Sequence, residues 1–365
     1  MKLLYITNGV NGSGGLERVL SVKASYFSKN RDYEVHIAGL NNGTENLFYN
    51  FDKKIKFHSI SIGGNPIKYI YQYITGFRRL VNEIKPDIIL VCDDGLKAFF
   101  LPLLLGKSSP IIYERHVSKN IELKGNASFI DRIIFKIKAK AMDVLSNTFD
   151  AFVVLTNDNV SEWKSTSEIH IISNPLSFYP EKSSTLLEKR VIAVGKQSYQ
   201  KGFDLLLKSW EKVHSKFPDW KLEIYGKKDK TVGLEKLASN LNIENSINFY
   251  EPEKDILTKY LQSSIYVLTS RFEGFGMVLI EAMACGIPCV SFDCPCGPKD
   301  IIKDNEDGFL VEAENISQFA EKIILLIEDK EKRLQMGKNA KENVKRYLPQ
   351  NIIEKWENLF TNLLK

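Results

Sequence analysis

The stretch from Ser264 to Phe292 constrains the fold of this chain more than any other. Ser264–Thr269 and Pro288–Phe292 are apolar runs of strand length, and a helix is expected between them. Two glycines precede the predicted helix, and Gly286 with the proline that soon follows ends it, as is usual for helix termini. The stretch therefore predicts a strand, a glycine-rich turn, a helix and a second strand.

Two carboxylates in this stretch have unusual positions. Glu281 lies inside an otherwise apolar helix, and Glu273 lies at the strand exit, with seven residues between them. A buried carboxylate needs a partner, because burying it unpaired is costly. The free amides at the helix start suit an anion, and Gly274 and Gly276 would let it approach the backbone. A sugar nucleotide fits this pattern, but a tight turn followed by a surface-exposed Glu281 fits the spacing as well.

The length of 365 residues predicts two domains of ordinary size, and a hydrophobic content of 44% supplies a core for both. No uninterrupted apolar run approaches the length of about 18 residues that suggests a membrane span. The first residues, Met1–Gly9, become polar too soon for a signal peptide. We therefore expect a cytoplasmic protein.

Four of the five cysteines fall within twelve residues, a clustering that invites a metal interpretation; they are Cys285, Cys289, Cys294 and Cys296. The C-x-x-C spacing of structural zinc sites is absent, and two of the four belong to the predicted helix end and buried strand. Reduced thiols in the core are the better interpretation, and no metal ligands are predicted.

Strand and helix signals alternate through the first half of the chain, including a helix over Leu96–Leu105 and a strand over Ile111–Glu114. This alternation favours a parallel α/β sheet. The polar stretch Tyr179–Ser184 has the composition of a linker, and a second series of strands and helices starts at Arg190. The sequence therefore predicts two α/β domains in succession.

The net charge of +5 comes from the first half of the chain. Residues 1–180 hold 22 Lys/Arg and 17 Asp/Glu, whereas residues 181–365 hold 28 of each. Nine basic and three acidic residues lie within Lys97–Lys140, which suits a phospholipid, a lipid diphosphate or nucleic acid, or is simply a solvated face. Within this region, Phe129–Leu145 has the pattern of a basic amphipathic helix, whose apolar stripe fits core packing and membrane-surface binding equally well.

The central stretch reads S-R-F-E-G-F-G and then E-A-M-A-C-G-I-P-C-V, with its two glutamates in an E-x7-E arrangement. It resembles the donor-site signature of retaining glycosyltransferases of family 4, and the resemblance is strongest over residues 190–312. It implies the GT-B fold, an α/β architecture of two Rossmann-like domains facing across a cleft. Residues 1–186 would bind the acceptor, residues 187–347 would bind the donor, and a C-terminal helix over 348–365 would cross back to the N-terminal domain.

The resemblance also implies a role for each matching residue. Glu273 would orient the transferred sugar, and His116 would contact that sugar near the reacting carbon from the carboxyl end of a strand, where open α/β sheets bind ligands. Lys196 stands where the family has an arginine, so its phosphate contact would lack a bidentate fork. The full set of implied donor-binding residues is Gly14, Gly15, Lys196, Lys201, Gly274, Phe275, Gly276, Met277 and Glu281.

The implied activity is transfer of a hexose or N-acetylhexosamine from a UDP-sugar, with retention, to an undecaprenyl diphosphate-linked oligosaccharide in surface polysaccharide biosynthesis, such as capsule or O-antigen. The alternatives are the same chemistry on a soluble, teichoic-acid or protein acceptor, and a nucleotide-sugar-binding protein without catalysis. Neither a metal or other cofactor nor a nucleic-acid partner is expected. The basic N-terminal domain would bind the inner face of the cell membrane, and Glu114 and Arg115 are acceptor-side candidates.

Overall fold

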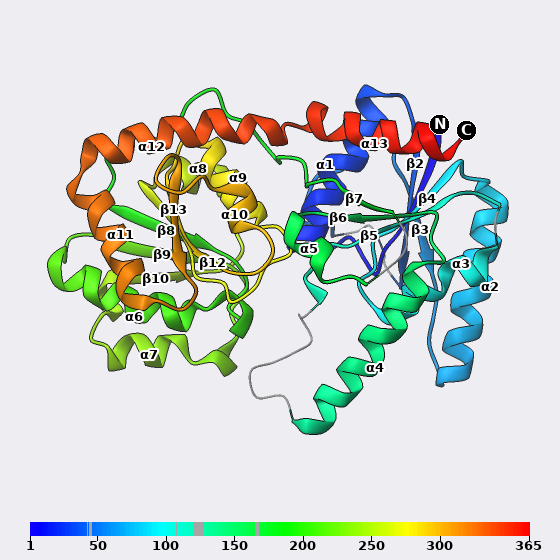
Figure 1. Cartoon of the computed structure of the whole chain (residues 1–365), viewed down its shortest axis with the longest axis horizontal. Coiled ribbons are helices and arrows are strands. Elements are labelled where there is room, and N and C mark those ends of the chain that lie inside the picture. Colours follow the sequence, from blue (N-terminus) through cyan, green and yellow to red (C-terminus); the bar gives the residue numbers. More distant parts are fainter. Residues whose placement is uncertain (42, 44–45, 107, 120–127, 165–167) are drawn as a thin grey trace. The chain divides into compact units, whose positions relative to one another are not determined.

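The computed structural model describes residues 1–41, 43, 46–106, 108–119, 128–164 and 168–365. The chain divides into two compact units (Figure 1). Unit 1 comprises Met1–Ser177 together with Pro349–Lys365, and unit 2 comprises Phe178–Leu348.

The boundary between the units lies at 177/178 and not at the expected 186/187, because the intervening segment is bound to unit 2. The Ser184 amide donates a hydrogen bond to the Cys285 carbonyl at 2.8 Å, and the Ser184 hydroxyl donates to the Ser263 carbonyl at 2.6 Å. Its polar composition therefore reflects side chains that bond to unit 2, and not a linker.

Unit 1 is built on a parallel sheet, which in the described residues has seven strands: β1 (Lys2–Ile6), β2 (Glu34–Leu40), β3 (Lys56–Ile60), β4 (Ile88–Val91), β5 (Ile111–Glu114), β6 (Ala151–Val154) and β7 (Ile169–Ile171). The strand order is β3-β2-β1-β4-β5-β6-β7. All residues of β4 and β5 are buried, as expected for parallel strands covered on both faces. The order reverses between β1 and β4, and the crevice at such a point is where open α/β sheets bind ligands.

Helices connect these strands: α1 (Gly15–Asn30), α2 (Pro66–Ile84), η1 (Leu96–Phe100), α3 (Leu101–Leu105), α4 (Phe129–Ser146), α5 (Asn157–Ser161) and, from the end of the chain, α13 (Pro349–Leu363). The helix expected over Leu96–Leu105 is split into a 3₁₀ turn and an α-helical turn. Pro102 has no N–H to donate, so the α-helical ladder cannot run through this point.

The C-terminal helix packs on unit 1, as predicted. Arg31 at the end of α1 forms an ion pair with Glu357 of α13 at 2.9 Å. The rings of Phe27 and Phe360 lie 5.5 Å apart between the same helices. Trp356 and Phe360 are both almost completely buried, so α13 is part of the core of unit 1.

Unit 2 repeats the same design with a parallel sheet of β8 (Arg190–Val194), β9 (Lys221–Tyr225), β10 (Ile247–Tyr250), β11 (Ile265–Leu268), β12 (Cys289–Asp293) and β13 (Gly308–Glu312). The strand order is β10-β9-β8-β11-β12-β13. Its main helices are α6 (Phe203–Lys216), α7 (Leu234–Asn240), α8 (Ile256–Leu261), α9 (Met277–Ala284), α10 (Pro298–Ile301), α11 (Ile316–Glu328) and α12 (Lys330–Asn343). The two predicted Rossmann-like α/β domains are therefore confirmed.

The apolar stripe of α4 faces solvent. Ile130 and Ile137 are 68% and 65% exposed, whereas Met142 of the same helix is buried. Core packing, one of the two interpretations that the sequence left open, is therefore wrong for this stripe. In Figure 1, α4 extends away from the strands of unit 1. No helix in the described part of the chain is both long enough and apolar enough to cross a membrane.

Candidate active site

Two predicted site residues of unit 2, Glu273 and Lys201, are in direct contact. The Lys201 ammonium donates to Oε1 of Glu273 at 2.6 Å, and the Ser270 hydroxyl donates to the same oxygen at 2.5 Å. Glu273 is only 5% exposed, and these two donors satisfy the buried carboxylate oxygen. A phosphate or sugar that accepts a hydrogen bond from Lys201 or Ser270 must share that donor with Glu273 or displace Glu273 from it.

The loops that carry these two residues are held together by backbone and side-chain contacts. Gly202 has φ +61°, and a Cβ at this position would lie 2.0 Å from the Thr269 carbonyl oxygen, so only glycine allows this approach. The Arg271 amide donates to the Gln200 carbonyl at 2.8 Å. The Arg271 guanidinium donates two hydrogen bonds to the Asp204 carboxylate, to Oδ1 at 2.9 Å and to Oδ2 at 2.7 Å. This bidentate geometry fixes both loops.

The glycine-rich turn leads into α9 as predicted. Gly276 caps the helix with φ +99°, a conformation that favours glycine, and Met277 is the first helical residue. Phe275 is buried with its ring edge-on to Tyr347 at 5.4 Å. A Cβ on Gly297 would lie 1.9 Å from the Phe275 carbonyl oxygen, so the turn is packed against the following loop. The turn that includes Gly274 thus presents the amide end of α9 from a closely supported backbone.

Glu281 points into unit 2 and not into solvent. It is 4% exposed, and the Tyr260 hydroxyl donates to its Oε2 at 3.5 Å. The interpretation of Glu281 as a helix-surface residue is therefore wrong. Lys196 lies in the turn after β8 and is exposed, which leaves its ammonium accessible to a ligand.

The glycine-rich turn of unit 1 differs from a simple phosphate cradle. Gly14 is the N-cap of α1 in an extended conformation, and Gly15 is the first helical residue. A Cβ on Gly14 would lie 2.7 Å from Oε2 of Glu17, whereas a Cβ on Gly15 would meet no atom within 4 Å. The Glu17 carboxylate therefore already lies beside the amide end of α1, and a diphosphate there requires it to turn away.

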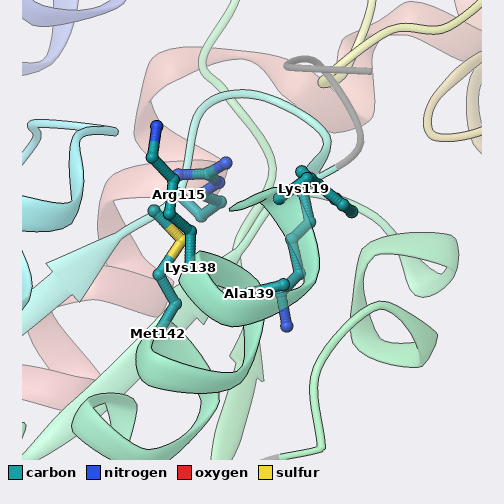
Figure 2. A pocket seen from close by; sticks show the side chains of 6 residues that line it. Arg115, Lys119, Lys138, Ala139 and Met142 are labelled. Atoms are coloured by element: carbon teal, nitrogen blue, oxygen red, sulfur yellow. The ribbon is translucent and has the colours of Figure 1, made fainter. Parts of the chain in front are cut away.

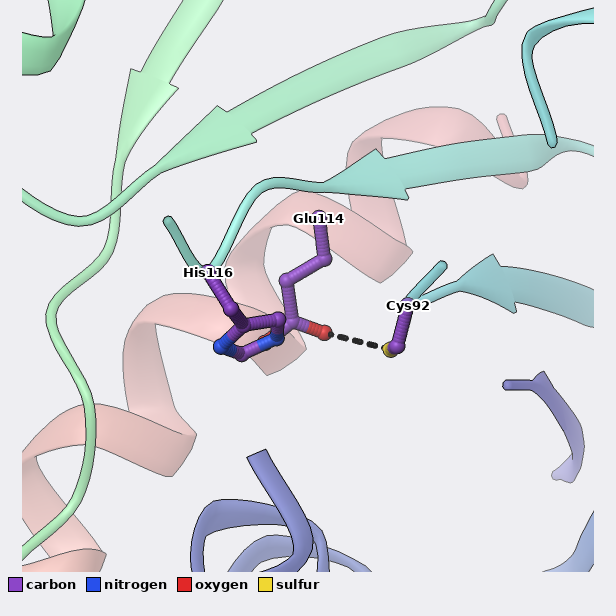
Figure 3. A group of neighbouring side chains, drawn as sticks. All are labelled: Cys92, Glu114 and His116. Carbon is purple, nitrogen blue, oxygen red and sulfur yellow. Dashed lines mark hydrogen bonds and ion pairs between the residues drawn. The ribbon is translucent and has the colours of Figure 1, made fainter. Parts of the chain in front are cut away.

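His116 follows β5 and lies in a buried group with Glu114 and Cys92, shown in Figure 3. Nε2 of His116 is 3.1 Å from Oε1 of Glu114, and the Cys92 thiol is 3.2 Å from Oε2. One ligand atom from each residue falls within 4.8 Å of the others, a spacing that a metal ion could bridge. However, the Lys23 ammonium donates to both oxygens of Glu114, and a positive charge in that position would repel a metal ion.

The charge of Glu114 is set by this lysine. Burial raises the pKa of Glu114, but Lys23, together with the contact to His116, outweighs burial and holds the pKa below its usual range. Burial and the Glu114 charge both raise the pKa of Cys92, so the thiol stays protonated and is a poor metal ligand. Glu114 is thus a buried, paired carboxylate, and its acceptor-side role stays a prediction.

Comparisons with known proteins show which family the chain resembles in sequence and in fold. The family model Glycosyl transferases group 1 matches residues 180–343, and Glycosyl transferase 4-like matches residues 16–148. An uncharacterized glycosyltransferase of Haemophilus influenzae is 32% identical, with 98% of this chain and 99% of that protein covered. The amylovoran biosynthesis glycosyltransferase AmsD of Erwinia amylovora is 30% identical, with the same shares covered.

The chain is a group 1 glycosyltransferase. A further relative of the glycosyltransferase is the Campylobacter jejuni GalNAc-alpha-(1->4)-GalNAc-alpha-(1->3)-diNAcBac-PP-undecaprenol alpha-1,4-N-acetyl-D-galactosaminyltransferase, 26% identical over 100% of this chain and 99% of that protein. The crystal structure of Anabaena Alr3699/HepE in complex with UDP superposes with a TM-score of 0.78 at 18% identity, covering 100% of both chains. The GT-B fold is thereby confirmed.

A small pocket of the glycosyltransferase lies beside α4 in unit 1 (Figure 2). Its lining residues are Arg115, Lys119, Phe135, Lys138, Ala139 and Met142. The internal volume of about 10 Å³ is near the minimum for one water molecule. Lys119 is paired with Asp143 at 2.5 Å, and the Arg115 guanidinium donates to the Asp94 carbonyl at 2.9 Å. The pocket is too small for a sugar. Arg115 also holds the backbone at Asp94, a structural contact that its assignment as an acceptor-side candidate did not anticipate.

The five cysteines of the glycosyltransferase are all described, buried and without a disulfide. Burial raises the pKa of Cys285 to about 12, and it raises the pKa of Cys289 and Cys294 well above the usual range. Zinc binds deprotonated thiolates, whereas these buried thiols are neutral. They fit the interpretation of the cysteines as reduced core residues.

Sequence reasoning missed Lys23, which α1 places at the centre of unit 1. Its neighbours along the helix at four-residue spacing, Val19 and Phe27, are buried apolar residues. A charged residue on the apolar stripe of a helix is the same signal that identified Glu281, and it would have marked Lys23 as a residue in need of a buried partner.

Proposed function

We propose that this glycosyltransferase transfers a hexose or N-acetylhexosamine from a UDP-sugar to a lipid-linked oligosaccharide, with retention of configuration, in polysaccharide biosynthesis. The contact between Lys201 and Glu273, which precedes α9, carries the proposal, because it joins a cation that can bind a phosphate to a carboxylate that can accept hydrogen bonds from sugar hydroxyls. The UDP in the Anabaena structure and the PP-undecaprenol in the name of the Campylobacter relative support donor and acceptor. The amylovoran relative supports polysaccharide biosynthesis.

In the proposed reaction, the acceptor hydroxyl attacks the anomeric carbon on the face from which the diphosphate leaves, and the diphosphate takes the hydroxyl proton. The bond from the anomeric carbon to the UDP oxygen breaks as the new glycosidic bond forms. The protein supplies positioning and stabilises the leaving-group charge. Lys201, Lys196 and the amides of α9 bind the diphosphate without a metal ion, Glu281 accepts the ribose hydroxyls, and Glu273 orients the sugar.

The alternatives differ in the acceptor or in catalysis. Acceptors that are soluble, of teichoic-acid type or proteins would use the same donor site. A nucleotide-sugar-binding protein without catalysis is disfavoured, because the buried Glu273 and Glu281 and the cations Lys196 and Lys201 are all present.

The donor is tested by thermal unfolding of the purified protein with UDP, GDP, ADP or UDP-sugars, without added metal and with a chelator. A nucleotide at a hundred times its Kd stabilises the folded state by about 2.7 kcal/mol, a clear rise in melting temperature. We expect the rise with UDP and UDP-sugars, at equal size in the chelator. No rise with any nucleotide would contradict the donor site, and a rise only with added Mg²⁺ would contradict metal-independent binding.

We further propose that α4 binds the membrane that holds the lipid-linked acceptor. Its outward face carries exposed apolar side chains, led by Phe129, Ile130, Ile134 and Ile137. Lys136 and Lys140 lie on the same exposed helix. Apolar side chains flanked by lysines are the composition of helices that lie in an anionic lipid surface.

Membrane binding is tested by sedimentation with vesicles of phosphatidylglycerol or of phosphatidylcholine. The wild type should bind the anionic vesicles, less so at high salt. Replacing Ile130, Ile134 and Ile137 by serine should weaken binding at least tenfold, because each loses apolar burial in lipid. Leu187→Ser, an exposed apolar residue of unit 2, is the matched control and should bind like the wild type. Equal binding by the triple variant would contradict the proposal.

A further inference from the structure

The first two turns of α2 carry large apolar side chains that face solvent. The buried residues of this helix begin at Tyr73. Before it lie three apolar residues that are between 57% and 81% exposed: Ile67, Ile70 and Tyr71. These turns are nevertheless well formed, because the Asn65 side chain caps the helix by accepting from the Lys68 amide at 2.9 Å. The sequence thus starts a stable helix whose first apolar side chains lie outside the core of unit 1.

The segment from η1 to α3 continues this apolar surface. Phe100 and Leu103 are 41% and 60% exposed, and α2 lies against α3. Nε of Arg78 donates to the Leu104 carbonyl at 2.5 Å, which ties the two helices together. We call the five exposed residues the α2–α3 patch: Ile67, Ile70, Tyr71, Phe100 and Leu103. A gathering of exposed apolar side chains of this size marks a site of contact with a protein or a membrane.

The charges around the α2–α3 patch select an anionic partner. Residues 65–82 contain three basic residues and no acidic residue, and all three are exposed: Lys68, Arg78 and Arg79. Residues 96–106 contain no acidic residue either. Apolar side chains with cations beside them are the composition of surfaces that lie in anionic lipid. The Tyr71 ring, which is apolar but carries a polar hydroxyl, suits the boundary between lipid and water.

The same charges disfavour a second copy of this chain as the partner. In a dimer with two-fold symmetry the patch would face itself, and the three basic residues of one copy would approach the same residues of the other. Like charges that face each other across an interface oppose binding. Anionic lipid headgroups neutralise these cations, so a lipid surface is the partner that the charges favour.

The α2–α3 patch is linked through the fold to the exposed face of α4. In Figure 1, α2 and α4 both extend below the strands of unit 1. η1 connects the two regions, because α3 follows it directly and α4 lies against it. Two weak contacts on one compact unit bind a surface more tightly than either contact alone, because the second forms at a high effective concentration.

We propose that the α2–α3 patch is a second membrane contact, which binds anionic phospholipid and lets unit 1 meet the bilayer through two helices. This inference deepens the proposed function, and it rests on that function for the lipid-linked acceptor that makes membrane contact useful. With α4 as the first contact, the patch fixes the orientation of unit 1 on the bilayer. A single contact would leave the unit free to turn about it.

Tryptophan fluorescence locates the contact directly. The four tryptophans of the chain are no more than 5% exposed, so a tryptophan placed on the surface is the one that lipid can reach. Ile70→Trp reports on the patch and Ile134→Trp reports on α4. Leu187→Trp in unit 2 is the matched control, since Leu187 is 58% exposed and Ile70 is 57% exposed. Phosphatidylglycerol vesicles with brominated acyl chains should quench the first two tryptophans and leave the third unquenched.

Sedimentation with phosphatidylglycerol vesicles measures the strength of the contact. Ile67→Ser combined with Ile70→Ser should weaken binding about tenfold, because two apolar side chains lose their burial in lipid. Lys68→Gln combined with Arg79→Gln should weaken binding at low salt and have little effect at high salt, where the charges are screened. Both variants keep Arg78, which holds α3, and thermal unfolding should show an unchanged fold.

Quenching of Ile134→Trp without quenching of Ile70→Trp would overturn the second contact and leave α4 as the membrane helix. Equal quenching of Leu187→Trp would also overturn it, because the protein would then adsorb without a preferred face. A dimer in sedimentation velocity that the paired serine variant abolishes, with no quenching by lipid, would show that the patch joins two copies instead. These measurements use no donor or acceptor, so absence of transfer from every UDP-sugar would refute the proposed function separately.

Discussion

Replacing Glu273 by glutamine should lower kcat by about a hundredfold or more while donor KM changes less than threefold. The carboxylate is held in one place by Lys201 and Ser270, and the amide keeps the size of the side chain but loses the charge that fixes the lysine. Misplacing a reacting group by about 1 Å costs on the order of a hundredfold in rate. Lys201 is then free to contact the diphosphate, so donor binding is retained. Steady-state kinetics at saturating acceptor check this prediction.

Ser270→Ala provides a graded comparison for this experiment. It removes one of two donors to Glu273 and leaves the Lys201 contact intact, so kcat should fall about tenfold or less. Thermal unfolding of both variants shows whether the loop remains folded. A kcat for Glu273→Gln within fivefold of the wild type, in a normally folded protein, would mean that Glu273 supports the loop and does not orient the sugar.

Local sequence patterns were enough to predict most of the fold. The strand Ile111–Glu114 has the predicted bounds, because a run of apolar and β-branched residues bounded by turns leaves few alternative structures. The helix over Leu96–Leu105 was less predictable, because Pro102 breaks the ladder without ending the turn. The unit boundary was misplaced because the polar composition of Tyr179–Ser184 does not reveal which side chains bond to unit 2.

The contacts within the candidate site were much less predictable than the residues. Glu273 and Lys201 were both identified, but each was given a separate role, and their ion pair spans 72 residues of sequence. Lys23 and Glu114 are 91 residues apart, and no local spacing connects them. Such pairs depend on how parallel strands and helices bring distant positions together, whereas motif and periodicity report only neighbours along the chain.

The amphipathic pattern of α4 shows a further limit. Periodicity identified an apolar stripe but could not decide whether it faces a core or solvent, because both arrangements have the same period. In the structure, the buried contact is made by Met142 and the stripe is exposed. In α1, by contrast, the apolar residues Val19, Leu20, Ala24 and Phe27 are buried.

Replacing Glu281 by alanine should raise donor KM by about 10- to 100-fold while kcat changes much less. A hydrogen bond to a charged acceptor contributes about 1.5–3 kcal/mol, and each 1.4 kcal/mol is a factor of ten in affinity. Glu281 is buried in α9, so water cannot fully replace a lost ribose contact. Donor kinetics and the Kd of UDP, measured by calorimetry, check the prediction, and a normal donor KM in this variant would refute the assignment.

The ribose contact can be isolated by changing the ligand as well as the protein. If Glu281 accepts the 2′-hydroxyl, 2′-deoxy-UDP should bind the wild type more weakly than UDP, whereas the Glu281→Ala variant should discriminate less between the two. Tyr260→Phe removes the hydroxyl that donates to Glu281 and keeps the carboxylate, so its donor KM should stay within threefold of the wild type. Full discrimination in Glu281→Ala would place the 2′-hydroxyl elsewhere, because a shared contact must couple the two losses.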